Sequence, residues 1–248
     1  MSGPHAAHLA ALEVLQDCLA SLYGVADAPK VSGFVLDEET QQALEQHGAI
    51  HARPGAREEV YVLDDGHSVD VAVFLDERAR EAAADAVAGG DVTLSSERFH
   101  DFCVALEGVS HFLLMSHRAF SERPVTQLEL ELQAEVDKYV MARLSPWHHR
   151  VTLTQDGEEP RVTAAVRVPS DGPRPEDLEG ALFDSFSLAP NLHHEQRERY
   201  VTASRLAHRY CRHLERTFLR ERRGTALTRN LRTFYRLGQA DRLAFIAR

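Results

Sequence analysis

The run CVALEGVSHFLLM, residues 103–115, is the most apolar stretch of the chain, yet it carries Glu107, Ser110 and His111. On a helix at about 100° per residue, four polar side chains fall in a stripe about 40° wide: His100, Glu107, His111 and Arg118. Apolar side chains take the opposite side and also border the stripe. The pattern predicts an amphipathic helix over 96–120 whose polar stripe is not simply a solvated face.

A second long helix should follow directly. Thr126 and Glu129 have the spacing of a capping box, which predicts a helix over 127–144, before Pro146. Because the connection over 121–125 is short, the two helices should be antiparallel neighbours. Residues whose numbers sum to about 244 should then lie at one level, which places Asp137 near Glu107.

These two helices therefore predict a polar patch that contains Glu107, His111 and Asp137. Such a patch can work as a general acid/base group, or Glu107 and His111 can ligate a divalent metal ion that carboxylates of the facing helix complete. The alternative is a hydrogen-bonded Glu107–His111 pair that only fixes helix register. Neither the His-Glu-x-x-His pattern of zinc proteases nor a repeated Glu-x-x-His is present.

The rest of the chain alternates helices with strands. Two stretches of alternating residues around an Asp-Gly pair predict β-hairpins, EVYVLDDGHSVDVAVFLD (59–76) and RVTLTQDGEEPRVTAAVRV (150–168). Further helices are predicted at 6–23, at 38–47 after the N-cap Asp37, at 77–88 after the N-cap Asp76, and at 176–186.

The C-terminal part is strongly basic. Residues 196–248 contain 14 Arg and no Lys against four acidic residues, so their net charge is 14 − 4 = +10. Because the whole chain has a net charge of −10, the other 195 residues carry a net charge of −20. A long helix over 195–222 should carry one arginine-rich face, whose partner-binding candidates are Arg205, Arg209, Arg212, Arg216 and Arg220. This face suits an acidic protein, nucleic acid, a second copy of the chain, or the chain's own acidic helix LELELQAEVD (128–137).

Composition and element order predict the fold class. The 248 residues are 44% hydrophobic and 27% charged, enough for a buried core. We expect a mainly helical α+β fold: the antiparallel helix pair, the long arginine-rich helix packed against it, and two β-hairpins. It should form a single compact domain over 1–248, with an acidic portion at 1–195 and a basic helical portion at 196–248.

Two further histidine groups and the cysteines carry weaker signals. His193-His194-Glu195 lies at a helix start, and Trp147-His148-His149 lies before a strand. Both groups are expected to be structural. The three scattered cysteines predict reduced thiols, with Cys211 as a small core residue.

The expected location is the cytoplasm, since the sequence has no secretory signal and no stretch that could span a bilayer, so no membrane partner is expected. The first functional interpretation is a non-enzymatic adaptor or assembly subunit of a larger cytosolic complex, which binds an acidic partner through the arginine-rich helix. The alternatives are a metal-assisted or acid/base hydrolase at Glu107, His111 and Asp137, and a nucleic-acid-binding module. The sequence decides neither the oligomeric state nor whether the protein is an enzyme.

Overall fold

The computed structural model of the chain describes residues 4–25, 28–64, 69–89, 97–144, 173–184 and 193–247. Its contacts divide into two compact units. Unit 1 comprises Met1–Asp17 and Ala28–Ser116, and unit 2 comprises Cys18–Asp27 and His117–Arg248. Two helices, α1 (Pro4–Tyr23) and α4 (Glu97–Phe120), contribute residues to both units. The whole basic segment belongs to unit 2.

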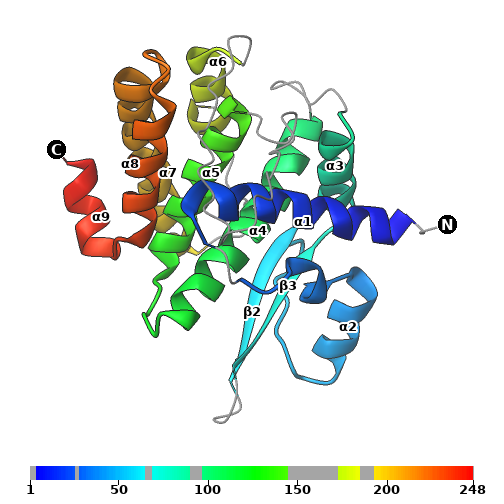
Figure 1. Cartoon of the computed structure of the whole chain (residues 1–248). Helices are drawn as coiled ribbons and strands as arrows, with labels where there is room; N and C mark the ends of the chain where they lie inside the picture. The colour runs from blue at the N-terminus through cyan, green and yellow to red at the C-terminus, as the bar shows by residue number, and fades with distance from the viewer. Residues whose placement is uncertain are drawn as a thin grey trace, which may run out of the picture. The chain divides into compact units, whose positions relative to one another are not determined.

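In unit 1, a small sheet and short helices follow α1 in the chain and precede α4. In chain order the elements are a 3₁₀ turn η1 (Val31–Gly33), β1 (Val35–Leu36), α2 (Glu38–Gln46), β2 (Glu58–Asp64), β3 (Val69–Leu75) and α3 (Glu77–Val87). The strand order is β1-β3-β2. β3 is parallel to β1 and antiparallel to β2 (Figure 1), and the turn of the first predicted hairpin lies outside the described residues.

The two faces of the sheet carry different residues because side chains alternate along each strand. Phe74 and Tyr61 lie on one face, in an apolar cluster with Ile50 and the α2 residue Leu44. Val73 and Leu75, both fully buried, lie on the other face, where α4 approaches at Gly108. β3 is therefore covered on both sides, which explains its run of apolar residues.

The predicted N-caps are confirmed. The Asp37 carboxylate accepts a hydrogen bond from the backbone N–H of Thr40 at 2.8 Å, at the start of α2. Asp76 accepts from the N–H of Ala79 at 2.8 Å, at the start of α3. Each bond satisfies one of the amide groups that the first turn of a helix leaves without an intrahelical partner.

Unit 2 is helical throughout its described part. Its elements are α5 (Gln127–Leu144), α6 (Pro175–Glu179), a π-helical turn η3 (Gly180–Asp184), α7 (His194–Leu214), a second π-helical turn η4 (Glu215–Leu219), α8 (Gly224–Arg236) and α9 (Gln239–Ile246). The α5 bounds agree with the predicted range 127–144. The capping box is also present, since Thr126 N donates to Glu129 Oε2 at 3.0 Å and Glu129 N donates to Thr126 Oγ1 at 3.2 Å.

The long arginine-rich helix packs against α5, as predicted (Figure 1). Arg199 lies 3.7 Å from Glu131, and Arg143 lies 3.3 Å from Glu215. Residue numbers rise together along both helices, so α5 and α7 run in the same direction. All residues from Glu131 to Ala142 are buried, which makes α5 the central helix of unit 2.

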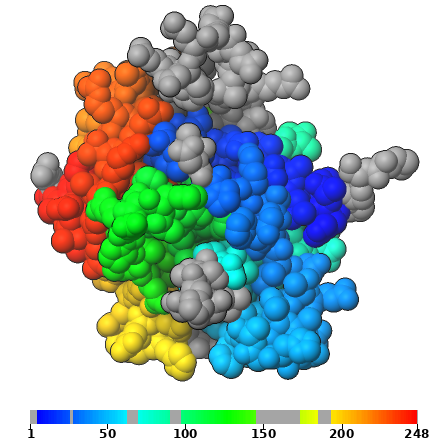
Figure 2. All heavy atoms as spheres, turned by 60° about the horizontal axis from the view of Figure 1, so that its bottom comes forward, coloured from blue at the N-terminus to red at the C-terminus, as the bar shows by residue number. Residues whose placement is uncertain are grey.

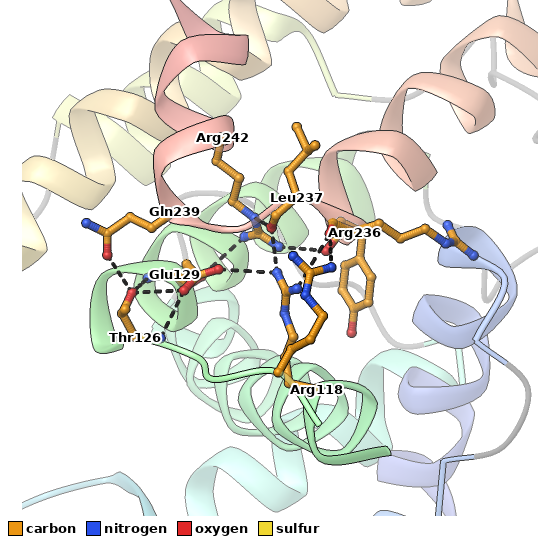
Figure 3. A network of polar contacts seen from close by, with 9 residues as sticks. Arg118, Thr126, Glu129, Arg236, Leu237, Gln239 and Arg242 are labelled. Carbon is orange, nitrogen blue, oxygen red and sulfur yellow. Dashed lines mark hydrogen bonds and ion pairs between the residues drawn. The ribbon is translucent and has the colours of Figure 1, made fainter. Parts of the chain in front are cut away.

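A buried ionic network holds the start of α5 to the corner between α8 and α9 (Figure 3). Arg118, in the last turn of α4, donates to Glu129 Oε1 at 3.2 Å and to the Leu237 carbonyl. Arg242 donates to the carbonyls of Leu237 at 3.0 Å and Tyr235 at 2.9 Å. The Arg118–Glu129 pair brings the last turn of α4 to the first turn of α5.

The predicted fold class is confirmed: the described chain is mainly helical and has one small sheet. The second predicted hairpin (150–168) lies outside the described residues. Within the part of the chain that the structure describes, every helix is too short or too polar to cross a membrane.

Candidate metal centre

The first residue of β2 brings a carboxylate to the helix-covered face of the sheet. Glu58 is paired with Leu75 across the β2–β3 ladder, and Val60 is paired with Val73. Residues directly opposite each other in a ladder have their side chains on the same face. Glu58 therefore points to the face that α4 covers, while its neighbour Glu59 points to the other face.

Gly108 allows α4 to lie close against this face. A Cβ atom at Gly108 would lie 2.9 Å from Leu75 Cδ2, and 3.2 Å from both Glu58 Cγ and Val73 Cγ1. Only a glycine fits at such a distance without a shift of the sheet residues. The close approach places the next turn of α4, which carries His111, beside Glu58.

Glu58, Glu107 and His111 form a cluster of metal-ligating groups. His111 Nδ1 lies 3.1 Å from Glu58 Oε1. One ligand atom from each of the three residues lies within 4.8 Å of the others. His111 and Glu58 are nearly buried, with side-chain exposures of 7% and 10%, and Glu107 is half-buried. Two of the three groups come from one helix face at four-residue spacing, and the third comes from the strand beneath it.

On the other face of the sheet, Glu59 has partners of its own. The Glu59 carboxylate lies 2.6 Å from Nε of Arg53, and the same carboxylate accepts a hydrogen bond from the Tyr61 hydroxyl at 2.6 Å. Burial and then this hydrogen bond raise the pKa of Tyr61. The cluster of Glu58, Glu107 and His111 combines two carboxylates with one imidazole, and both kinds of group are ordinary metal ligands.

Asp137, the third predicted catalytic residue, belongs to unit 2. Its carboxylate accepts a hydrogen bond from the Tyr23 hydroxyl, and another from Gln133 Nε2 at 2.8 Å. All three side chains are buried. Burial, and next the Asp137 charge, raise the pKa of Tyr23 well above its usual value, so the hydroxyl stays a hydrogen-bond donor. The Asp137 carboxylate is thus held by buried hydrogen-bond donors of unit 2.

The predicted arginine face is exposed. All five of its arginines are exposed: Arg205, Arg209, Arg212, Arg216 and Arg220. Of the weaker candidates, His193 and His194 are exposed at the start of α7, drawn in yellow in Figure 2. Residues 147–149 lie outside the described residues.

Cys211 is fully buried, and burial raises its pKa well above the usual value, as expected for a core residue. No disulfide links any of the three cysteines, all of which are described.

Glu58 is the one member of the cluster that sequence reasoning missed. It lies 53 residues before His111, and no local pattern links the two. A signal was nevertheless present: Glu58 precedes Val60 by two residues, so it continues the inward-facing set of β2 as a charged residue. A carboxylate in an inward-facing strand position needs a partner.

No protein-family model, curated protein or solved structure matches this chain. The basis for a functional proposal is therefore the chemistry of the cluster of Glu58, Glu107 and His111.

Proposed function

We propose that this protein binds a divalent transition-metal ion through Glu58, Glu107 and His111. The observation that carries the proposal is the convergence of one imidazole and two carboxylates, within 4.8 Å of one another, from a strand and a helix. Carboxylate oxygens and a neutral imidazole are ordinary ligands of Zn²⁺ and Mn²⁺.

The spacing fits a shared ion. Metal–ligand bonds of about 2.0–2.2 Å place neighbouring ligand atoms roughly 3 Å apart. The 3.1 Å between His111 Nδ1 and Glu58 Oε1 already has this value. A ligand atom of Glu107 lies within 4.8 Å of the other two, and the helix keeps Glu107 one turn from His111. The metal then replaces the proton between Glu58 and His111.

Three protein ligands leave one coordination position for water. This is the pattern of catalytic rather than structural zinc sites, where the ion lowers the pKa of its bound water to about 7. The second candidate function, which depends on the first, is therefore metal-assisted hydrolysis at Glu58, Glu107 and His111. A Glu–His pair that only supports the fold is the competing interpretation.

A metal titration tests the proposal. Protein stripped with a chelator is titrated with Zn²⁺, and separately with Mn²⁺, by isothermal titration calorimetry. We expect one site per chain in the wild type and its loss in Glu107→Gln. The matched control is Glu97→Gln, which removes an exposed carboxylate from the first turn of the same helix.

Acidification must weaken the binding, because the metal competes with protons for the imidazole and the carboxylates. A wild type that takes up neither ion, or a Glu107→Gln variant that binds as well as Glu97→Gln, would show that the cluster is only structural.

A further inference from the structure

Five exposed arginines lie along α7 and the π-helical turn η4 that follows it, and we call them the arginine stripe: Arg205, Arg209, Arg212, Arg216 and Arg220. Arg205, Arg209 and Arg212 are three and four residues apart and so lie on one side of α7, and Arg216 and Arg220 continue this spacing into η4 and the residue after it. The opposite side of α7 is buried in unit 2 through residues such as Ala207 and Cys211. The stripe is therefore the outward face of a helix that is fixed on its other side.

The acidic helix that could have neutralised the stripe is engaged elsewhere. The carboxylates of α5 are buried in unit 2 and have other partners. Glu129 pairs with Arg118, Glu131 with Arg199, and Glu135 with Lys138. Of these three basic partners only Arg199 lies on α7, and none of them belongs to the stripe.

Among the described residues, the stripe has one weak ion pair within its unit. Arg212 Nε lies 3.9 Å from Glu179 Oε1, and the Arg212 side chain remains 55% exposed. Arg209 and Arg216 donate to backbone carbonyls, those of Ala247 and Arg212. Such contacts orient the guanidinium groups but leave their charges uncompensated.

We propose that the arginine stripe is a docking surface for a partner protein that presents carboxylates along a helix. Glutamates at three- and four-residue spacing on such a helix would face the arginines one to one, and guanidinium groups bind carboxylates through paired hydrogen bonds. Within the chain itself, the Arg212–Glu179 pair shows only that a carboxylate can approach the stripe, at 3.9 Å.

Two observations favour a carboxylate partner over nucleic acid. The exposed large apolar side chains among the described residues are Val14, Val62 and Phe120, so α7 offers no exposed aromatic ring for base stacking. The chain as a whole carries a net charge of −10, which opposes the approach of a densely charged polyanion. This surface lies in unit 2 and does not depend on the metal centre of unit 1.

The test uses a fluorescent helical peptide with glutamates at three- and four-residue spacing, and a peptide with glutamines at the same positions. Binding to the full-length protein is followed by fluorescence anisotropy. The variant Arg205→Glu/Arg209→Glu/Arg216→Glu reverses the stripe. Its control, Arg197→Glu/Arg222→Glu/Arg229→Glu, reverses three exposed arginines of unit 2 that lie outside the stripe.

We expect the glutamate peptide to bind the wild type and the control alike, and the stripe variant at least tenfold more weakly. The glutamine peptide should not bind. Equal weakening in both variants, or no binding of the glutamate peptide, would overturn the proposal. A labelled DNA duplex that binds the stripe more tightly than the peptide does, with a steep dependence on salt, would overturn it in favour of nucleic acid.

Discussion

At Gly108 the backbone of α4 comes so close to the sheet that a methyl group would lie 2.9 Å from Leu75 Cδ2. The same residue sits between Glu107 and His111 in sequence, and next to Glu58 in space. A glycine in the middle of a helix costs stability relative to alanine. Its presence here is explained by the close approach, which brings Glu107 and His111 beside Glu58.

The Gly108→Ala substitution should therefore destabilise the protein. Overpacking of this kind costs about 1–3 kcal/mol, and replacing a helical glycine regains at most about 1 kcal/mol. We expect a net loss of roughly 1 kcal/mol or more in the free energy of unfolding, measured by urea denaturation, together with weaker metal binding. The control is Gly180→Ala, where a new Cβ would meet nothing within 4 Å. Equal effects of the two substitutions would argue against the close approach.

The sequence alone identified two of the three members of the cluster, Glu107 and His111. Glu107 and His111 were identified because helical periodicity is a local property that the sequence carries directly. Glu58 was not, because its contact with His111 spans 53 residues and depends on strand register and on Gly108. The placement of Asp137 beside Tyr23 depends likewise on a contact over 114 residues.

At the scale of elements, capping explains why several helix starts were predicted correctly. Asp37 starts α2 through its hydrogen bond to Thr40, and this bond holds the pKa of Asp37 below its usual value. A carboxyl whose pKa is lowered in the folded state stabilises the protein above the unfolded-state pKa of about 3.9, and this contribution is lost as the pH falls through the folded-state value.

Asp37→Ala should accordingly cost about 1 kcal/mol at pH 7, the usual contribution of an N-cap. The difference from the wild type should shrink once the pH falls below about 4. Asp37→Asn, which keeps a capping oxygen, should lose much less at pH 7. Urea denaturation at both pH values checks this, and a cost of Asp37→Ala that is unchanged in acid would contradict the role of the charged cap.

A larger loss of stability is expected when the network of Figure 3 in unit 2 is broken. Glu129 is the carboxylate beside Arg118, and both side chains are nearly buried, at 3% and 2% exposure. Burial, and next the charge of Arg118, lower the pKa of Arg242 to about 10, whereas Glu129 raises it. Without Glu129, two buried guanidinium groups would face each other uncompensated.

We expect Glu129→Gln to destabilise the protein by about 3–5 kcal/mol, the range found when one partner of a buried ion pair is removed. Glu122→Gln, in the exposed turn after α4, is the matched control and should change the free energy of unfolding by less than about 0.5 kcal/mol. Thermal or urea unfolding of the two variants gives the comparison. A Glu129→Gln variant as stable as the wild type would mean that the network does not hold α5 to the corner between α8 and α9.

In the molecule as a whole, the net charge of residues 196–248 does not reveal what each arginine contacts. Arg232 donates to the Leu22 carbonyl at 3.1 Å, and Arg236 donates to the Tyr23 carbonyl at 3.2 Å, so both bind the end of α1. Arg242 is buried within unit 2. Part of the basic charge therefore stabilises the fold, and another part remains exposed as the arginine stripe. Only the tertiary structure separates the two sets, whereas the helices themselves follow from local periodicity and capping.

The most direct test of the metal centre is the metal content of protein purified without chelators or a histidine tag. It is measured by mass spectrometry for the wild type, Glu58→Gln and Glu59→Gln. The last two variants change neighbouring carboxylates on opposite faces of the same strand, and circular dichroism checks that both are folded. We predict close to one transition-metal ion per chain in the wild type and in Glu59→Gln, and almost none in Glu58→Gln. A metal-free wild type, or a Glu58→Gln variant that retains the metal, would contradict a metal centre at Glu58, Glu107 and His111.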